Sequence, residues 1–366
     1  MGISVPYRGY TTIDFARDEA TGAIGDSVTV LPFVVAVAVL TDLSLSMMLI
    51  WFGVFQIVWG LVYGVPISVE PMKALAALIL AGTITTGEFL LAGILLGVVL
   101  LGMGMTDTLG RVGQYIGSPV VRGIQFGVGL VLIESGLRIG VADPRLAGLA
   151  VGAVLLVIIL GYWNLSAIVV LVLGGLIAGF EIGIPSPTIP TTDGIFLAST
   201  ASLTLPTIEA AVAQLAMSVG NAALAASILL SDYFDRDISA DTLSTSMGAM
   251  NLVALPFGAL PMCHGSGGIA GKYAFGARTA GANVILGVGY ITIALVAVEL
   301  VAAYPVSMLG VILVLIGLQL GRTSIEQSQA YPLVIGIGIL GLVVNLGVAF
   351  LIGILLYLCL QHREKE

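Results

Sequence analysis

The side chains best suited to chemistry lie beside two segments that share one spelling, Pro-x4-Pro-Met, at residues 66–72 and 256–262. Each segment interrupts a strongly apolar stretch. Glu70 and Lys73 lie at the end of the first segment, inside otherwise apolar sequence. An ammonium or carboxylate in such surroundings is costly and usually marks an ion or substrate path. The first segment is therefore a candidate ion-binding site, and the second is its counterpart.

Pro71 and Pro261 each suit the first position of a helix, because the missing N–H of proline costs nothing there. The free N–H groups and positive dipole end of such a helix bind anions. Two half-helices with facing N-termini would form a cradle for an oxyanion, and the glycines after His264 would let backbone amides approach it. The expected binding residues are Asp26, Pro71, Met72, Lys73, Asn221, Pro261, Cys263, His264, Gly265, Ser266 and Gly267.

Carboxylates near this site need a separate role, because negative charge repels an anion. We expect Glu70 or Asp26 to be neutral, or paired with Lys73, when the anion binds. Glu70 is therefore a candidate proton carrier, with Asp26 as the second candidate. The alternatives are a solvated position for Glu70 and a purely structural ion pair for Lys73. Asn221, the counterpart of Asp26 in the second half, should supply hydrogen bonds rather than charge.

Cys263 and His264 raise the question of metal or catalytic chemistry. Adjacent side chains cannot easily chelate one ion, and the only other histidine, His362, lies near the C-terminus. The sequence offers no third ligand and no nucleophile with a base. We therefore expect no metal, no cofactor and no enzymatic activity. Arg122 is expected to extend to the cytoplasmic surface rather than to contact a substrate.

The composition indicates a membrane protein. Of 366 residues, 58% are hydrophobic and only 9% are charged, against roughly 25% charged residues in soluble domains. The mean hydropathy is +1.12. The 48 glycines suit helices that approach each other closely in lipid. Membrane lipid and a small inorganic oxyanion are thus the expected partners, with no nucleic acid.

Apolar runs near the length of about 20 residues needed to cross a bilayer predict an all-α polytopic protein. The expected spans are residues 22–40, 45–63, 88–105, 119–138, 146–161 and 165–180 in the first half, and 207–230, 242–255, 283–301, 304–320, 331–343 and 345–361 in the second. In each half, a short broken helical segment after the Pro-x4-Pro-Met pattern is the seventh element.

Three landmarks recur in the same order in both halves, which indicates an internal duplication. They are Gly25-Asp26 with Gly220-Asn221, the two Pro-x4-Pro-Met segments, and Pro119-Val120 with Pro305-Val306. An odd number of elements per half makes the repeats inverted, with the two broken helices at the membrane midplane. The expected boundaries are a cytoplasmic N-terminal segment at 1–21, a first repeat at 22–182, a linker at 183–206, a second repeat at 207–361 and a cytoplasmic tail at 362–366.

The distribution of Lys and Arg predicts the orientation in the cell membrane. With both termini in the cytoplasm, nine basic residues, Lys272 among them, fall on the cytoplasmic side. Arg138 and Arg145 fall outside. The excess favours this orientation.

Three segments, GVPISVEPMKALAAL, SPVVRGIQFGVGL and NLVALPFGALPMCHGSGGIAGKYAFGAR, resemble the molybdate transporter branch of the sulfate permease superfamily. The resemblance implies a seven-plus-seven inverted repeat with a core domain and a gate domain, and an oxyanion as cargo. This chain departs from the family at Glu70, where relatives usually have Gln. It also has Ser27 and Val28 where relatives more often have Leu and Gly.

The leading hypothesis is a proton-coupled secondary transporter of a tetrahedral oxyanion, working by alternating access. Molybdate is the first candidate, with sulfate or tungstate next. The alternatives are a nucleobase or aromatic-carboxylate permease of the same architecture, which would need more stacking side chains near the breaks, and an anion channel. The coupling ion and the oligomeric state stay open, and a homodimer is one option.

Overall fold

The computed structural model describes residues 13–183, 185–187 and 203–363. Most of the expected N-terminal segment, linker and tail therefore lies outside the described residues. The first half contains α1 (Arg17–Leu40), α2 (Leu45–Tyr63), β1 (Glu70–Pro71), α3 (Lys73–Leu80), α4 (Thr86–Met105), α5 (Leu109–Ile116), α6 (Ser118–Gly140), α7 (Pro144–Ile159) and α8 (Ser166–Ile182).

The second half contains a further set of helices. These are α9 (Leu205–Met217), a π-helical segment (Ser218–Ala225), α10 (Ala226–Phe234), α11 (Ala240–Ala254), β2 (Met262–Cys263), α12 (Ser266–Ala274), α13 (Gly281–Val296), α14 (Val298–Ala302), α15 (Val306–Glu326), α16 (Tyr331–Val343) and α17 (Leu346–Arg363). Within the described residues, six helical segments are long and apolar enough to cross a membrane, and the bent α1 would make a seventh. The chain is therefore a multi-pass membrane protein.

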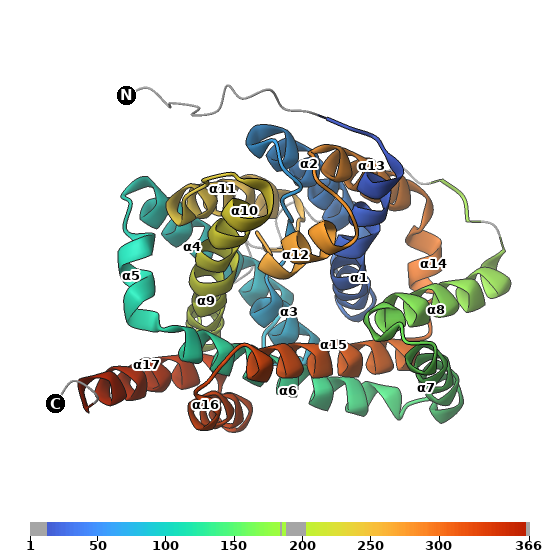
Figure 1. Cartoon of the computed structure of the whole chain (residues 1–366). Helices are drawn as coiled ribbons and strands as arrows, with labels where there is room; N and C mark the ends of the chain where they lie inside the picture. The colour runs from blue at the N-terminus through green and yellow to red at the C-terminus, as the bar shows by residue number, and fades with distance from the viewer. Residues whose placement is uncertain (1–12, 184, 188–202, 364–366) are drawn as a thin grey trace.

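Long helices pack closely in pairs at glycines. In the antiparallel pair α6 and α15, a Cβ added to Gly129 would meet the Gly317 oxygen at 2.7 Å, and one added to Gly136 would meet the Gly310 oxygen at 2.5 Å. These backbones touch because neither residue has a side chain. In Figure 1, α6 and α15 lie side by side beneath the short central helices α3 and α12.

The two Pro-x4-Pro-Met segments meet in space. β1 and β2 pair antiparallel, with Glu70 opposite Cys263 and Pro71 opposite Met262. The Met72 N–H also donates to the Pro261 carbonyl at 2.8 Å. This pairing places the starts of α3 and α12 beside each other near the centre of the molecule (Figure 1).

The half-helices themselves begin later than the sequence predicts. α3 starts at Lys73 and α12 at Ser266, so Pro71 and Pro261 are not their first residues. A proline disfavours helical conformation in the residue before it, and here Glu70 and Pro71 form an extended strand instead. With 8 and 9 residues, both helices are far shorter than a membrane span. The interruption of the two spans is thus confirmed, while the expected start positions are wrong.

Candidate functional site

A pocket of about 430 Å³ lies where the N-terminal ends of α3 and α12 face α6 and α15. We call it the cationic pocket, because its lining contains two basic side chains and no Asp or Glu. Its polar wall includes Lys73, Arg122, Gln125, Asn221, Ser266 and Gly267. Four of the sequence-predicted residues therefore line it, namely Lys73, Asn221, Ser266 and Gly267.

Glu70 lies at the first turn of α12, next to this pocket. Its Oε1 accepts the Gly268 N–H at 2.6 Å, and its Oε2 lies 2.5 Å from the Lys73 ammonium. The side chain is only 1% exposed. Gly265 and Gly268 leave room for this carboxylate, because a Cβ at either would strike it. An anionic group thus already occupies one amide of the predicted cradle.

The first turn of α3 is also capped by a side chain. Gln214 of α9 accepts the N–H groups of Ala74 at 2.8 Å and Leu75 at 3.4 Å through its Oε1. Its Nε2 donates to Ser218 Oγ at 3.1 Å. Gln214 therefore occupies the Ala74 and Leu75 amides of α3, which are not available to an anion as the predicted cradle requires.

The amides at the start of α12 remain for a ligand. Among the described residues, no acceptor is bound to the backbone N–H of Ser266 or Gly267, and both residues line the cationic pocket. The Ser266 hydroxyl donates to Asn221 Oδ1 at 2.7 Å. Asn221 lies in the π-helical segment, and such a local widening of a helix is frequent at functional sites. These groups form a polar wall opposite α6.

Asp26 is held by a buried network rather than by Lys73. Lys272 of α12 lies 3.1 Å from Asp26 Oδ2, and both side chains are fully buried. The ammonium also donates to Gln56 Oε1 at 2.9 Å, to Asn283 Oδ1 at 3.0 Å and to a backbone carbonyl. Ser68 donates to Asp26 Oδ1 at 2.7 Å. The assignment of Lys272 to the cytoplasmic surface is therefore wrong, because a carboxylate distant in the sequence compensates its charge inside the protein.

Cys263 and His264 are both buried. The His264 Nδ1 lies 3.0 Å from the Ser68 carbonyl, and its Nε2 lies 2.7 Å from Ser246 Oγ. A carbonyl only accepts, so Nδ1 carries the proton in the neutral ring. The one hydroxyl proton of Ser246 has two acceptors within reach, His264 Nε2 and the Leu243 carbonyl at 2.9 Å. Neither Cys263 nor His264 lines the cationic pocket. The same holds for Asp26, Pro71, Met72, Pro261 and Gly265. Among the described residues, no group of three His, Cys, Asp or Glu side chains has the spacing of a metal site.

Arg122 and Gln125 are pocket residues that the sequence analysis did not assign to the site. Arg122 Nη1 donates to Gln125 Oε1 at 2.7 Å, one turn further along α6. Both side chains line the cationic pocket. The sequence signal was an arginine inside an apolar span, followed three residues later by a glutamine.

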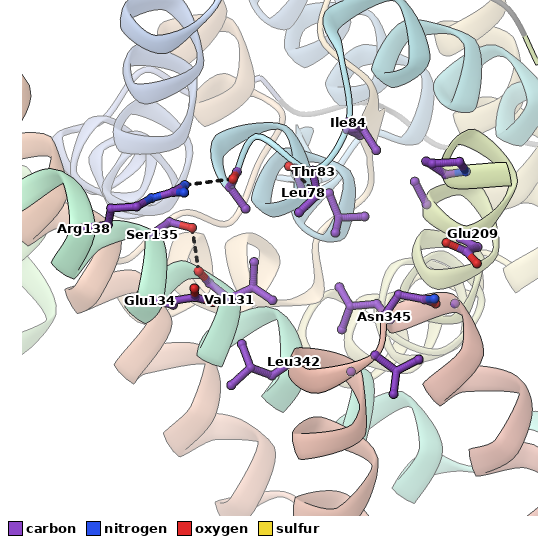
Figure 2. A pocket seen from close by; sticks show the side chains of 17 residues that line it. Leu78, Thr83, Ile84, Val131, Glu134, Ser135, Arg138, Glu209, Leu342 and Asn345 are labelled. Atoms are coloured by element: carbon purple, nitrogen blue, oxygen red, sulfur yellow. Dashed lines mark hydrogen bonds between the residues drawn. The ribbon is translucent and has the colours of Figure 1, made fainter. Parts of the chain in front are cut away.

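A second pocket of about 390 Å³ lies at the opposite end of α3 (Figure 2). We call it the acidic pocket, because it is lined by Glu134, Glu209 and one basic residue, Arg138. Arg138 Nη2 donates to the Ala81 carbonyl at the end of α3, at 2.9 Å. Two carboxylates against one guanidinium make this pocket less suited to an anion than the cationic pocket.

Comparison with known sequences identifies similar proteins. The profile of a family described as "Molybdate transporter of MFS superfamily" matches residues 18–132 and again residues 206–320. Molybdate transporter 2 of Arabidopsis thaliana is 31% identical, over 95% of this chain and 88% of the relative. Molybdate transporter 1 of the same plant is 30% identical, over 94% and 88% respectively. The family resemblance predicted from the three sequence segments is confirmed.

Solved structures with the same fold are also known. The transmembrane domain of the cyanobacterial bicarbonate transporter BicA aligns with a TM-score of 0.70, at 16% identity, over 93% of this chain and 98% of that one. The structure of SLC26A9 aligns with a TM-score of 0.68, at 15% identity, over 93% and 64%. At this identity the similarity concerns the fold alone. It confirms the predicted all-α polytopic fold.

Proposed function

Because the chain belongs to the molybdate transporter family, we propose that it is a secondary transporter that moves molybdate through the cell membrane together with protons. The observation that carries this proposal is the cationic pocket. It combines Lys73, Arg122 and the first amides of α12 in a cavity lined by no carboxylate. A tetrahedral oxyanion offers four acceptor oxygens, and every one of these groups is a donor.

Proton coupling follows from the charges around Glu70. Glu70 pairs with Lys73, and Asp26 pairs with Lys272, so these four charges sum to zero. A divalent anion entering beside them would meet no net positive charge from this group. Protonation of Glu70 releases the charge of Lys73 for the anion. The ionisable groups that face Glu70 are Asp26, Lys73, Cys263, Lys272 and Tyr290.

The positions of the two pockets support alternating access. The cationic and acidic pockets lie at opposite ends of α3 and along opposite halves of α6. A shift of the α3 and α12 half-helices along α6 and α15 would expose the bound anion to one side and then the other. We place both termini in the cytoplasm, because eight basic residues against two still favour this orientation without Lys272.

The function can be tested with purified protein in liposomes. We expect uptake of molybdate that tungstate and sulfate compete with and uracil does not, and stimulation of uptake by a lower external pH. Unlabelled molybdate inside the vesicles should accelerate the entry of labelled molybdate, because a carrier exchanges the two across the membrane. Competition by uracil alone would favour a nucleobase permease, and uptake without such acceleration would favour a channel.

Lys73→Met tests the site itself. Uptake should fall to background, because the cationic pocket loses one of its two basic side chains. Since this change also leaves Glu70 buried without its partner, the double variant Lys73→Met/Glu70→Gln removes both charges and should fold normally but still not bind molybdate. Arg145→Met, an exposed cation outside both pockets, is the matched control. Wild-type affinity in the double variant would show that Lys73 has no role in binding.

A further inference from the structure

Arg122 differs from the other cations around the cationic pocket, because no carboxylate among the described residues pairs with it. Lys73 is paired with Glu70 and Lys272 with Asp26, whereas among the described residues Arg122 forms no ion pair. Its only hydrogen bond there is to the neutral Gln125 amide. We propose that Arg122 is a direct ligand of the cargo and supplies the second positive charge that makes the pocket selective for divalent oxyanions. This inference rests on the proposed transport of molybdate.

The geometry around Arg122 suits this role. Gln125 is 5% exposed and holds Nη1 of the guanidinium at 2.7 Å, which fixes the orientation of the side chain without cancelling its charge. The remaining N–H groups form a planar fork that matches two oxygens of an oxyanion. Because Arg122 is on α6 and Lys73 is on α3, an anion bound to both side chains would bridge these two helices.

The number of positive charges in the cationic pocket explains the expected selectivity for divalent over monovalent anions. With Glu70 protonated, the pocket presents two positive charges, Lys73 and Arg122. A divalent anion neutralises them, whereas without Arg122 it would leave one uncompensated negative charge in a poorly solvated site. A monovalent tetrahedral anion needs Lys73 alone. Loss of Arg122 should therefore weaken binding of the divalent anion much more than binding of the monovalent one.

Perrhenate is a suitable probe, because it is tetrahedral like molybdate but carries a single negative charge. Equilibrium binding of both anions would be measured on the full-length protein in lipid nanodiscs, at the pH of tightest wild-type binding. Arg122→Gln should weaken molybdate binding by about 10- to 100-fold, the value of a charge-assisted hydrogen bond, and perrhenate binding by less than about 3-fold. Arg122→Lys should restore much of the preference for molybdate. Arg145→Gln is the control.

The binding experiment has outcomes that would overturn the inference and outcomes that would overturn the proposed function. Equal loss for both anions in Arg122→Gln would show that Arg122 supports the structure of the pocket rather than the charge of the cargo, and would overturn the inference. Unchanged molybdate affinity would overturn it too. If the wild-type protein binds perrhenate and no molybdate, the proposed function itself fails. If the wild-type protein binds molybdate and Arg122→Gln binds it equally well, the role of Arg122 is refuted while the proposed function stands.

Discussion

Glu70→Gln is the sharpest test of how cargo and protons are linked. The carboxylate is buried against the Gly268 amide and the Lys73 ammonium. Glutamine has the same shape and keeps one acceptor oxygen for the Gly268 N–H, but it carries no charge. The variant should therefore fold and mimic the protonated state at every pH. It also restores the residue that the family resemblance leads us to expect at this position.

The size of the effect follows from the repulsion between Glu70 and the anion. A carboxylate roughly 5 Å from a divalent anion repels it by about 7 kcal/mol at an effective dielectric constant near 20. A proton taken up with the anion removes this repulsion. Binding that takes up one proton weakens about 10-fold for each unit of rising pH, or about 100-fold from pH 6 to pH 8.

The assay is equilibrium binding of molybdate at pH 6, 7 and 8. The wild-type dissociation constant should rise about 100-fold across this range, whereas that of Glu70→Gln should change little. Glu134→Gln, in the acidic pocket, is the control and should keep the wild-type slope. A slope that persists in Glu70→Gln would refute the role of Glu70 as proton carrier. Asp26 or a sodium ion would then be the next candidates.

Two further predictions concern stability, measured by thermal unfolding of the purified protein. Lys272→Met should cost about 3–5 kcal/mol, because it leaves Asp26 buried without a counter-charge, and the double variant with Asp26→Asn should recover part of this loss. An unaffected single variant would contradict the buried ion pair. Gly268→Ala should cost roughly 1–3 kcal/mol, because its Cβ would strike Asp26 and Glu70. Gly267→Ala, whose Cβ would be 4.0 Å from Glu70 Oε1, should stay within about 1 kcal/mol of wild type. Equal losses in the two glycine variants would contradict the position of Glu70.

The helices could be predicted from the sequence because lipid makes each span a local property of the chain. An apolar run of sufficient length forms a helix whatever surrounds it. The expected span 45–63 accordingly coincides with α2. The prolines of the two Pro-x4-Pro-Met segments likewise predicted the two helix breaks, because the effect of a proline on the backbone is also local. The exact starts of α3 and α12 were missed, because the pairing of β1 with β2 keeps the prolines extended, and that pairing is a contact between distant segments.

The pairing of charges could not be predicted, because it depends on distant contacts. Lys272 lies near glycines and aromatic residues that read as a loop, and its partner Asp26 is on α1. Likewise, nothing in the local sequence of α9 indicates that Gln214 caps α3. Arg122 was expected at the membrane surface, and only the position of α6 opposite α3 places it in the pocket. The family resemblance predicted the cargo class, but it did not indicate which cations remain available to the cargo.

The N-terminal amides of the two central half-helices are each capped by a side chain from the other half of the chain, but one cap is a glutamine and the other a glutamate. This difference indicates where the proposed proton coupling would take place. The amides of α3, in the first half of the chain, bind Gln214 from the second half. The Gly268 amide of α12, in the second half, binds Glu70 from the first. A glutamine cap cannot change its charge, so α3 presents the same electrostatic surface at every pH. A glutamate cap can, and it pairs with the Lys73 ammonium, a proposed ligand of the cargo. Under the proposed mechanism, the proton that enters with the cargo would therefore be taken up at the cap of α12 and not at the cap of α3.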